Sequence, residues 1–174
     1  MRQLALVAAL LAAPADAVVT ADTAAGFAIE HEVVIGAPPE RVYAALGQPS
    51  AWWSSRHSWS GNAANLGLDL RPGGCFCERL PDGGGVEHAR VVMAWPGKLL
   101  RLTGALGPLQ AEALTGTLTW ELKPAAAGTS VKLTYVVAGF MRNGRTAMPA
   151  AVDSVLDEQL AGLKMFVETS AKGG

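Results

Sequence analysis

The sequence is poor in cysteine, in charge and in long apolar runs, and each shortage excludes a class of protein. Two cysteines in 174 residues cannot make a disulfide-rich scaffold. Charged residues make up 17% of the chain, the formal net charge is −1 and no basic stripe occurs, so we expect no nucleic-acid partner. No segment after residue 17 offers the roughly twenty apolar residues of a spanning helix, so we expect no stable membrane insertion after signal cleavage.

Motifs for catalysis and metal binding are also missing. The run Gly83-Gly84-Gly85 is not followed by Lys-Ser/Thr and precedes a predicted strand, which is typical of a turn. The three histidines, His31, His57 and His88, show no metal-ligand spacing. We therefore predict neither a metal site nor a cofactor.

The N-terminus has the order of a secretory signal. Arg2 precedes an apolar run over Leu4–Ala13, and Ala15-Asp16-Ala17 is a small-x-small cleavage site. The run is about ten residues long, half of what a transmembrane anchor needs. We predict a signal peptide over residues 1–17 and a periplasmic or secreted mature chain that begins at Val18.

The rest of the chain predicts a strand, short helices, six more strands and a long helix. Residues 18–26 are expected to form a linker, Phe27–Ile35 a strand, and Pro38–Leu46 a helix opened by Pro38-Pro39-Glu40. One more helical turn is expected over Ala51–Ser55. Short runs of turn residues then separate six alternating segments, which we predict to be antiparallel strands: Leu66–Leu70, Gly74–Leu80, Val86–Trp95, Lys98–Gly104, Leu114–Lys123 and Thr129–Gly139.

The last element is a predicted helix of about twenty residues that opens at Pro149. Its apolar residues share one stripe, interrupted by Gln159. A sheet with one dry face can bury that stripe by curling round the helix. The sequence therefore predicts an α+β fold of about seven antiparallel strands in one domain over residues 27–170, followed by a tail over 171–174.

The two cysteines, Cys75 and Cys77, lie two apart on a predicted strand. A regular strand would hold their Cα atoms roughly 6.6 Å apart, near the limit for a disulfide and with poorly directed Cβ atoms. We predict two buried, free thiols.

Several short segments, together with the order of the elements, match a known family pattern. They are Ile35–Tyr43, Trp52-Trp53, Pro72–Glu78, Gly128-Thr129 and the terminal helix. In these segments the chain resembles the START-like (SRPBCC) superfamily, above all the branch of polyketide-cyclase-like proteins and homologues of the heat-shock-protein ATPase activator. The resemblance spans residues 27–169 and implies a helix-grip fold with a hydrophobic cavity between the sheet and the long helix. Members mostly bind lipids, polyketides, hormones or similar apolar molecules, and a minority catalyse reactions on them.

Glu78 and His88 are the weak candidates for catalytic residues. If residues 81–85 form the whole hairpin loop, Leu80 pairs with Val86, Glu78 lies opposite His88, and Phe76 lies opposite Arg90. The pair is then either an acid/base or hydrogen-bonding pair in the cavity, or an exposed ion pair on the wet face.

Gln159 and the aromatic residues are the other candidates for contact with a ligand. A buried amide needs a partner, which is a polar group of a ligand, a strand carbonyl or a trapped water. Trp53 and Trp59 flank a polar loop that the resemblance places at the cavity mouth. Trp120 and Tyr135 fall on the dry face of adjacent strands, where packing in the core is their main expected role.

The sequence leaves three functions open, and we favour a binding module for a hydrophobic or amphipathic small molecule. An enzyme of cyclase, hydratase or hydrolase type would use Glu78 and His88 as acid and base. A protein-interaction module related to the heat-shock-protein ATPase activator is the third hypothesis, although an export signal departs from a cytosolic role. The sequence does not indicate an oligomeric state. The candidate ligand-binding residues are Trp53, Trp59, Phe76, Glu78, His88, Trp120, Tyr135 and Gln159.

Overall fold

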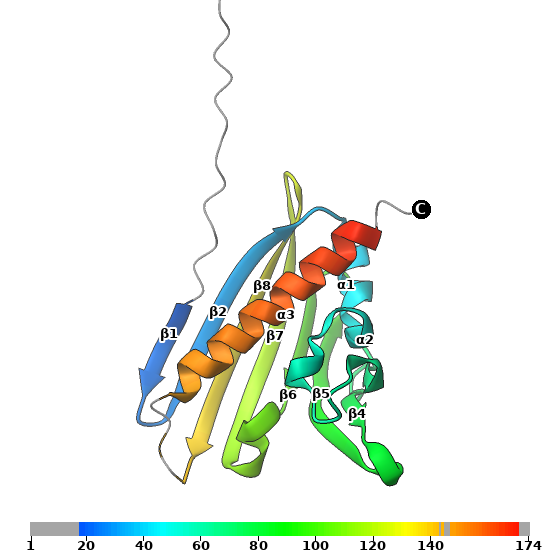
Figure 1. Ribbon diagram of the computed structural model, residues 1–174. Helices are drawn as coiled ribbons and strands as arrows, with labels where there is room; N and C mark the ends of the chain where they lie inside the picture. Colours follow the sequence, from blue (N-terminus) through cyan, green and yellow to red (C-terminus); the bar gives the residue numbers. More distant parts are fainter. Residues whose placement is uncertain (1–17, 143, 145–146, 171–174) are drawn as a thin grey trace, which may run out of the picture.

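One antiparallel sheet curls around a long C-terminal helix (Figure 1). The computed structural model describes residues 18–142, 144 and 147–170. The expected signal peptide over 1–17 and tail over 171–174 lie outside the described residues. No helix in the described part of the chain is long and apolar enough to cross a membrane.

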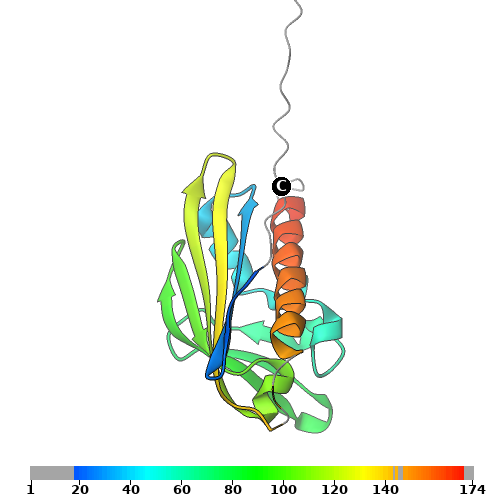
Figure 2. The same cartoon turned by 90° about the vertical axis from the view of Figure 1, so that its left-hand side faces the viewer.

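The sheet has eight strands in the order β1-β2-β8-β7-β6-β5-β4-β3, and every neighbouring pair is antiparallel. Helix α3 lies across one face of it (Figure 2), and the short helices follow β2. The strands are β1 (Val18–Thr23), β2 (Gly26–Ile35), β3 (Leu66–Leu68), β4 (Cys75–Arg79), β5 (Gly85–Trp95), β6 (Leu99–Thr103), β7 (Ala113–Ala125) and β8 (Gly128–Phe140). The helices are α1 (Pro39–Leu46), α2 (Pro49–Trp52) and α3 (Met148–Ser170), with 3-10 turns η1 (Ser55–His57), η2 (Ala63–Asn65), η3 (Pro81–Gly83) and η4 (Gly107–Ala111).

The predicted α+β helix-grip architecture is confirmed, with one correction at its N-terminal edge. Residues 18–23, which we expected to form part of a linker, are strand β1, paired with β2 from Val18–Glu30 to Thr23–Gly26. Most side chains of β1 are exposed. The strand therefore lacks the alternation of buried and exposed residues that reveals a strand in sequence.

The core lies between the concave face of the sheet and α3. Leu118, Trp120 and Leu122 alternate inward along β7, as their spacing predicts, and α3 meets them with a buried stripe. Gly162 in this helix allows a close crossing, because a Cβ there would lie 2.4 Å from the Trp52 carbonyl oxygen. The approach holds α2, and the loop that follows it, against α3. The buried residues of the α3 stripe are Leu156, Gln159, Leu160, Leu163 and Val167.

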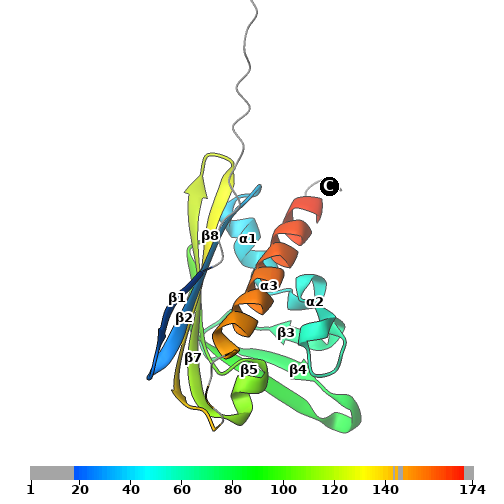
Figure 3. The ribbon, with the colours of Figure 1, turned by 60° about the vertical axis from the view of Figure 1, so that its left-hand side comes forward.

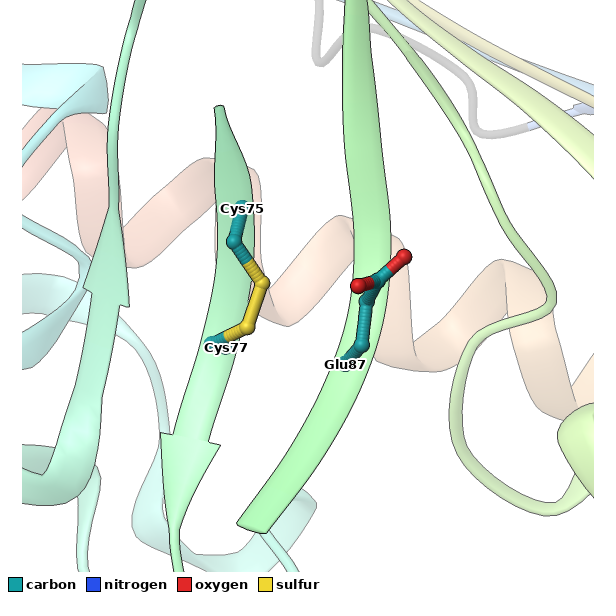
Figure 4. A group of neighbouring side chains, drawn as sticks. All are labelled: Cys75, Cys77 and Glu87. Atoms are coloured by element: carbon teal, nitrogen blue, oxygen red, sulfur yellow. A yellow bond between two sulfur atoms is a disulfide. The ribbon is translucent and has the colours of Figure 1, made fainter. Parts of the chain in front are cut away.

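The prediction of free thiols is wrong, since Cys75 and Cys77 form a disulfide (Figure 4). Their Cα atoms are 5.4 Å apart, well within the range for a disulfide. The prediction assumed a regularly extended strand. The pairing of β4 with β5 shifts between Phe76 and Cys77, so the strand is irregular where the cysteines lie.

Candidate functional site

A cavity of about 270 Å³ opens between the N-terminal half of α3, strands β4 and β5, and the loop after α2. Figure 3 shows that half of the helix facing β4 and β5, with α2 and its loop alongside. Apolar and aromatic side chains make most of the wall. The lining residues are Trp53, Arg56, His57, Ser58 and Trp59 from the loop, Phe76 and His88 from the sheet, Leu106, Gly107 and Pro108 before and at the start of η4, and Met148, Ala151, Val152, Val155 and Leu156 from α3.

Half of the sequence-predicted ligand-binding residues line this cavity. They are Trp53, Trp59, Phe76 and His88. The other four lie behind its wall or in the core. They are Glu78, Trp120, Tyr135 and Gln159.

Glu78 and His88 form a buried hydrogen-bonded pair at the inner end of the cavity. His88 Nε2 lies 2.9 Å from Glu78 Oε2, and the Glu78 side chain is fully enclosed. The same carboxylate accepts the backbone N–H of Trp59 at 3.0 Å and that of Ser60 at 2.5 Å. Glu78 therefore ties the loop to β4 and holds the His88 ring in one orientation. An exposed ion pair, the other reading of these two residues, is excluded.

The hairpin register that led us to this pair is wrong, although the contact itself is present. Glu78 pairs with Val86 and Phe76 with Ala89, so each pairs with a residue other than the one predicted. His88 is the extra residue of β5 at the bulge between these pairs. The bulge leaves its side chain buried on the same side of the sheet as Glu78. A bulge of this kind has no signal in the sequence.

The environment keeps Glu78 ionised and His88 neutral near pH 7. Burial raises the pKa of the Glu78 carboxyl, but hydrogen bonds from Ser60, Trp59 and His88 outweigh burial, so this pKa lies below its ordinary value. Burial lowers the pKa of His88, and Glu78 offsets that effect only in part. An ionised carboxylate can only accept hydrogen bonds, so His88 Nε2 carries the proton and donates it to Glu78.

An aromatic wall runs from the loop after α2 to this pair. Trp53 meets Phe76 edge-on with ring centroids 5.2 Å apart, and Phe76 lies 5.0 Å from the His88 ring. Trp53 Nε1 donates to the His57 carbonyl at 2.9 Å, which fixes the indole. Trp59 lies at the rim and is 55% exposed.

Two of the predicted ligand-binding aromatics are core residues. Trp120 is buried against Trp52, with ring centroids 6.1 Å apart. The Tyr135 hydroxyl donates to the Gly104 carbonyl and accepts the N–H of Leu106, both at 3.0 Å. Tyr135 thus positions Leu106, which lines the cavity. Burial raises its pKa to about 12, so the phenol stays protonated.

Gln159 is fully buried, and its amide is satisfied by the protein itself. Its Oε1 accepts the backbone N–H of Ser54 at 2.8 Å, and its Nε2 donates to the Val155 carbonyl at 3.1 Å. The partner is neither a strand carbonyl nor a group in the cavity. Gln159 joins α3 to the loop that carries the aromatic wall.

Glu158 makes a second link between α3 and this loop, and sequence reasoning missed it. Arg56 Nη2 donates to one of its oxygens at 2.8 Å, and His57 Nε2 lies 3.0 Å from the other. Hydrogen bonds from Arg56, Ser54 and His57 lower the pKa of Glu158 to about 2, although burial opposes them. These pairs are about one hundred residues apart in sequence and follow no local spacing, so nothing in the sequence pointed to them.

Cys75, Cys77 and Glu87 form a group on the outer face of the sheet, away from α3 (Figure 4). Their possible ligand atoms lie within 4.8 Å of one another. Both sulfurs are disulfide-bonded, and Glu87 forms an ion pair with Arg90. The group therefore offers no thiolate to a metal.

The family described as polyketide cyclase / dehydrase and lipid transport matches residues 27–168, from β2 almost to the end of α3. The chain belongs to this family. The START-like (SRPBCC) resemblance read from the sequence is thereby confirmed. No curated protein matches the chain.

Solved structures of this fold come from several bacteria. An uncharacterized protein from Rhizobium leguminosarum is 24% identical with a TM-score of 0.60, over 82% of this chain and 94% of that one. A protein from Mesorhizobium loti is 22% identical with a TM-score of 0.60, over 82% and 97%. CalU16 from Micromonospora echinospora is 16% identical with a TM-score of 0.56, over 84% and 80%. At these identities the likeness concerns the fold alone.

Proposed function

We propose that the mature chain is an exported protein that binds a small apolar or amphipathic molecule in the cavity between α3 and the sheet. The observation that carries the proposal is the cavity of about 270 Å³ with an aromatic wall on one side and aliphatic α3 side chains on the other. Its size is just below the range of pockets for drug-sized ligands, which favours a ligand of two or three rings or a short chain. The family description, which names polyketides and lipids, is consistent with such a ligand.

The placing of polar groups supports an amphipathic ligand rather than a purely polar one. Arg56 is at the open end of the cavity, with a side chain that is 79% exposed. At the enclosed end, His88 lies beside Phe76, and both side chains are buried. A ligand would bury most of its apolar surface and meet few polar atoms, as is usual for small-molecule sites.

Export is the other half of the proposal. It rests on the signal-peptide order of residues 1–17, with Arg2, an apolar run and a small-x-small cleavage site. Cleavage after Ala17 would leave Val18 as the first residue of the mature chain.

A matched pair of substitutions tests the binding site. Val155 lines the cavity, and Val136 is an exposed valine on β8. V155W fills the cavity, so we expect it to weaken binding of 2-methoxynaphthalene at least tenfold in equilibrium dialysis, whereas V136W leaves the dissociation constant unchanged. Equal binding by V155W and the parent protein, or no saturable binding by the parent, would overturn the proposed site.

An enzyme that uses the same cavity is the second candidate, favoured by the neutral His88 imidazole held by an ionised, buried Glu78. Such a pair is suited to accept a proton from a bound substrate. If the protein is a cyclase, hydratase or hydrolase, H88F should abolish turnover of a substrate that it still binds. Turnover by H88F at the parent rate would rule out His88 as the base.

A further inference from the structure

The two nitrogens of His88 have different surroundings. Nε2 is bonded to Glu78, and no described residue makes a hydrogen bond with Nδ1. Among the described residues, His88 Nδ1 does not belong to the enclosed polar side-chain atoms that lack a hydrogen-bond partner, so Nδ1 is not enclosed. Since His88 lines the cavity and is otherwise buried, Nδ1 is reached from the cavity.

The protonation of Nδ1 follows from its partner across the ring. Glu78 already accepts two backbone N–H groups and can only accept from His88 as well, so the proton is on Nε2. In the neutral ring, Nδ1 then carries a lone pair and no hydrogen. The atom that His88 offers to the cavity is therefore a hydrogen-bond acceptor and cannot donate.

Other polar side chains that line the cavity each make a contact within the protein, and those of Arg56 and His57 are far more exposed than that of His88. Arg56 and His57 contact Glu158, Ser58 Oγ donates to the Ser55 carbonyl, and Trp53 Nε1 donates to the His57 carbonyl. The indole of Trp59 lies at the exposed rim. At the enclosed end of the cavity, His88 Nδ1 is thus a polar side-chain atom that has no hydrogen-bond partner among the described residues.

We propose that His88 Nδ1 accepts a hydrogen bond from a hydroxyl group of the ligand, so that the ligand is an apolar molecule whose buried end carries an alcohol or a phenol. This inference rests on the proposed binding function and specifies the chemistry of the ligand. A carboxylate or a ketone at the same place would bring its own lone pairs against Nδ1 and lose a bond to water without replacement. The Phe76 ring beside His88 provides a surface for the apolar body next to the hydroxyl.

Two probes of matched shape test the proposal on the parent protein. 2-Naphthol offers a hydroxyl donor, and 2-methoxynaphthalene has the same rings with the donor blocked. We expect 2-naphthol to bind about tenfold more tightly in equilibrium dialysis, the value of one neutral hydrogen bond. Equal dissociation constants for two probes that both bind in the cavity would overturn the proposal and leave the binding function intact. No V155W-sensitive binding of either probe would instead refute the binding function.

The variant H88F tests whether the preference for 2-naphthol depends on His88 Nδ1. It removes the acceptor and retains a ring, while Glu78 keeps the N–H groups of Trp59 and Ser60. We expect the tenfold preference for 2-naphthol over 2-methoxynaphthalene to vanish, because neither probe then meets an acceptor at this position. A preference that survives in H88F would contradict the role of Nδ1.

Nitrogen-15 NMR of the parent protein gives a readout that does not depend on a variant's folding. Long-range proton–nitrogen correlations of His88 should show a protonated Nε2 and an unprotonated Nδ1, with the Nδ1 resonance shifting on addition of 2-naphthol. A proton on Nδ1 in the free protein, or an Nδ1 resonance that 2-naphthol leaves unmoved, would overturn the proposal.

Discussion

Gln159 is a polar residue in the apolar stripe of α3, and its side chain is bonded to the backbone of Ser54 and Val155. Its position in the sequence left a ligand group, a strand carbonyl and a trapped water open as partners. Its role is to hold the loop that carries Trp53 and Trp59 against the helix. Gln159 thus affects the shape of the cavity indirectly, by positioning the loop that forms part of its wall.

We predict that Q159L is destabilised by about 1–3 kcal/mol, because it leaves the partly buried N–H of Ser54 without its acceptor. Urea unfolding of Q159L and the parent measures the difference. Gln48, which is exposed and makes one long hydrogen bond of 3.5 Å, provides the matched control, and Q48L should be close to neutral. A Q159L variant as stable as the parent would show that the contact with Ser54 contributes nothing.

The secondary-structure elements were predictable where their pattern reflects burial. Strand β7 and helix α3 each bury one face, and the alternation on β7 and the stripe on α3 revealed both. Strand β1 was missed because nearly all of it is exposed at the edge of the sheet. Its existence depends on pairing with β2, which is a property of the assembled sheet.

The β4–β5 hairpin shows why the candidate site could be predicted only in part. Regular strand pairing predicted the contact between Glu78 and His88, and regular strand geometry predicted that Cys75 and Cys77 form no disulfide. The observed pairing contains a bulge: Glu78 and His88 are in contact through a different register, and the cysteines of the irregular strand are bridged. The cavity wall also depends on contacts between the loop and α3, which no sequence spacing encodes.

For the whole molecule, export and the disulfide lead to one prediction. The protein from an extracytoplasmic fraction should have the intact mass of residues 18–174, and reduction should add two hydrogens as the Cys75–Cys77 disulfide opens. Intact-mass spectrometry before and after reduction measures both. Recovery of the chain with Met1 only in the cytosol would contradict export, and an unchanged mass on reduction would contradict the disulfide.

The central claim is that the cavity between α3 and the sheet binds an apolar molecule. Intermolecular nuclear Overhauser effects between 2-methoxynaphthalene and isotope-labelled protein test it most directly, because they identify the side chains that touch the probe. We predict contacts from the probe rings to Val155, Leu156 and Phe76, which line the cavity from both sides. Saturable binding with contacts only to exposed apolar side chains of the sheet, such as Val92 and Trp95, or the absence of binding, would contradict the claim.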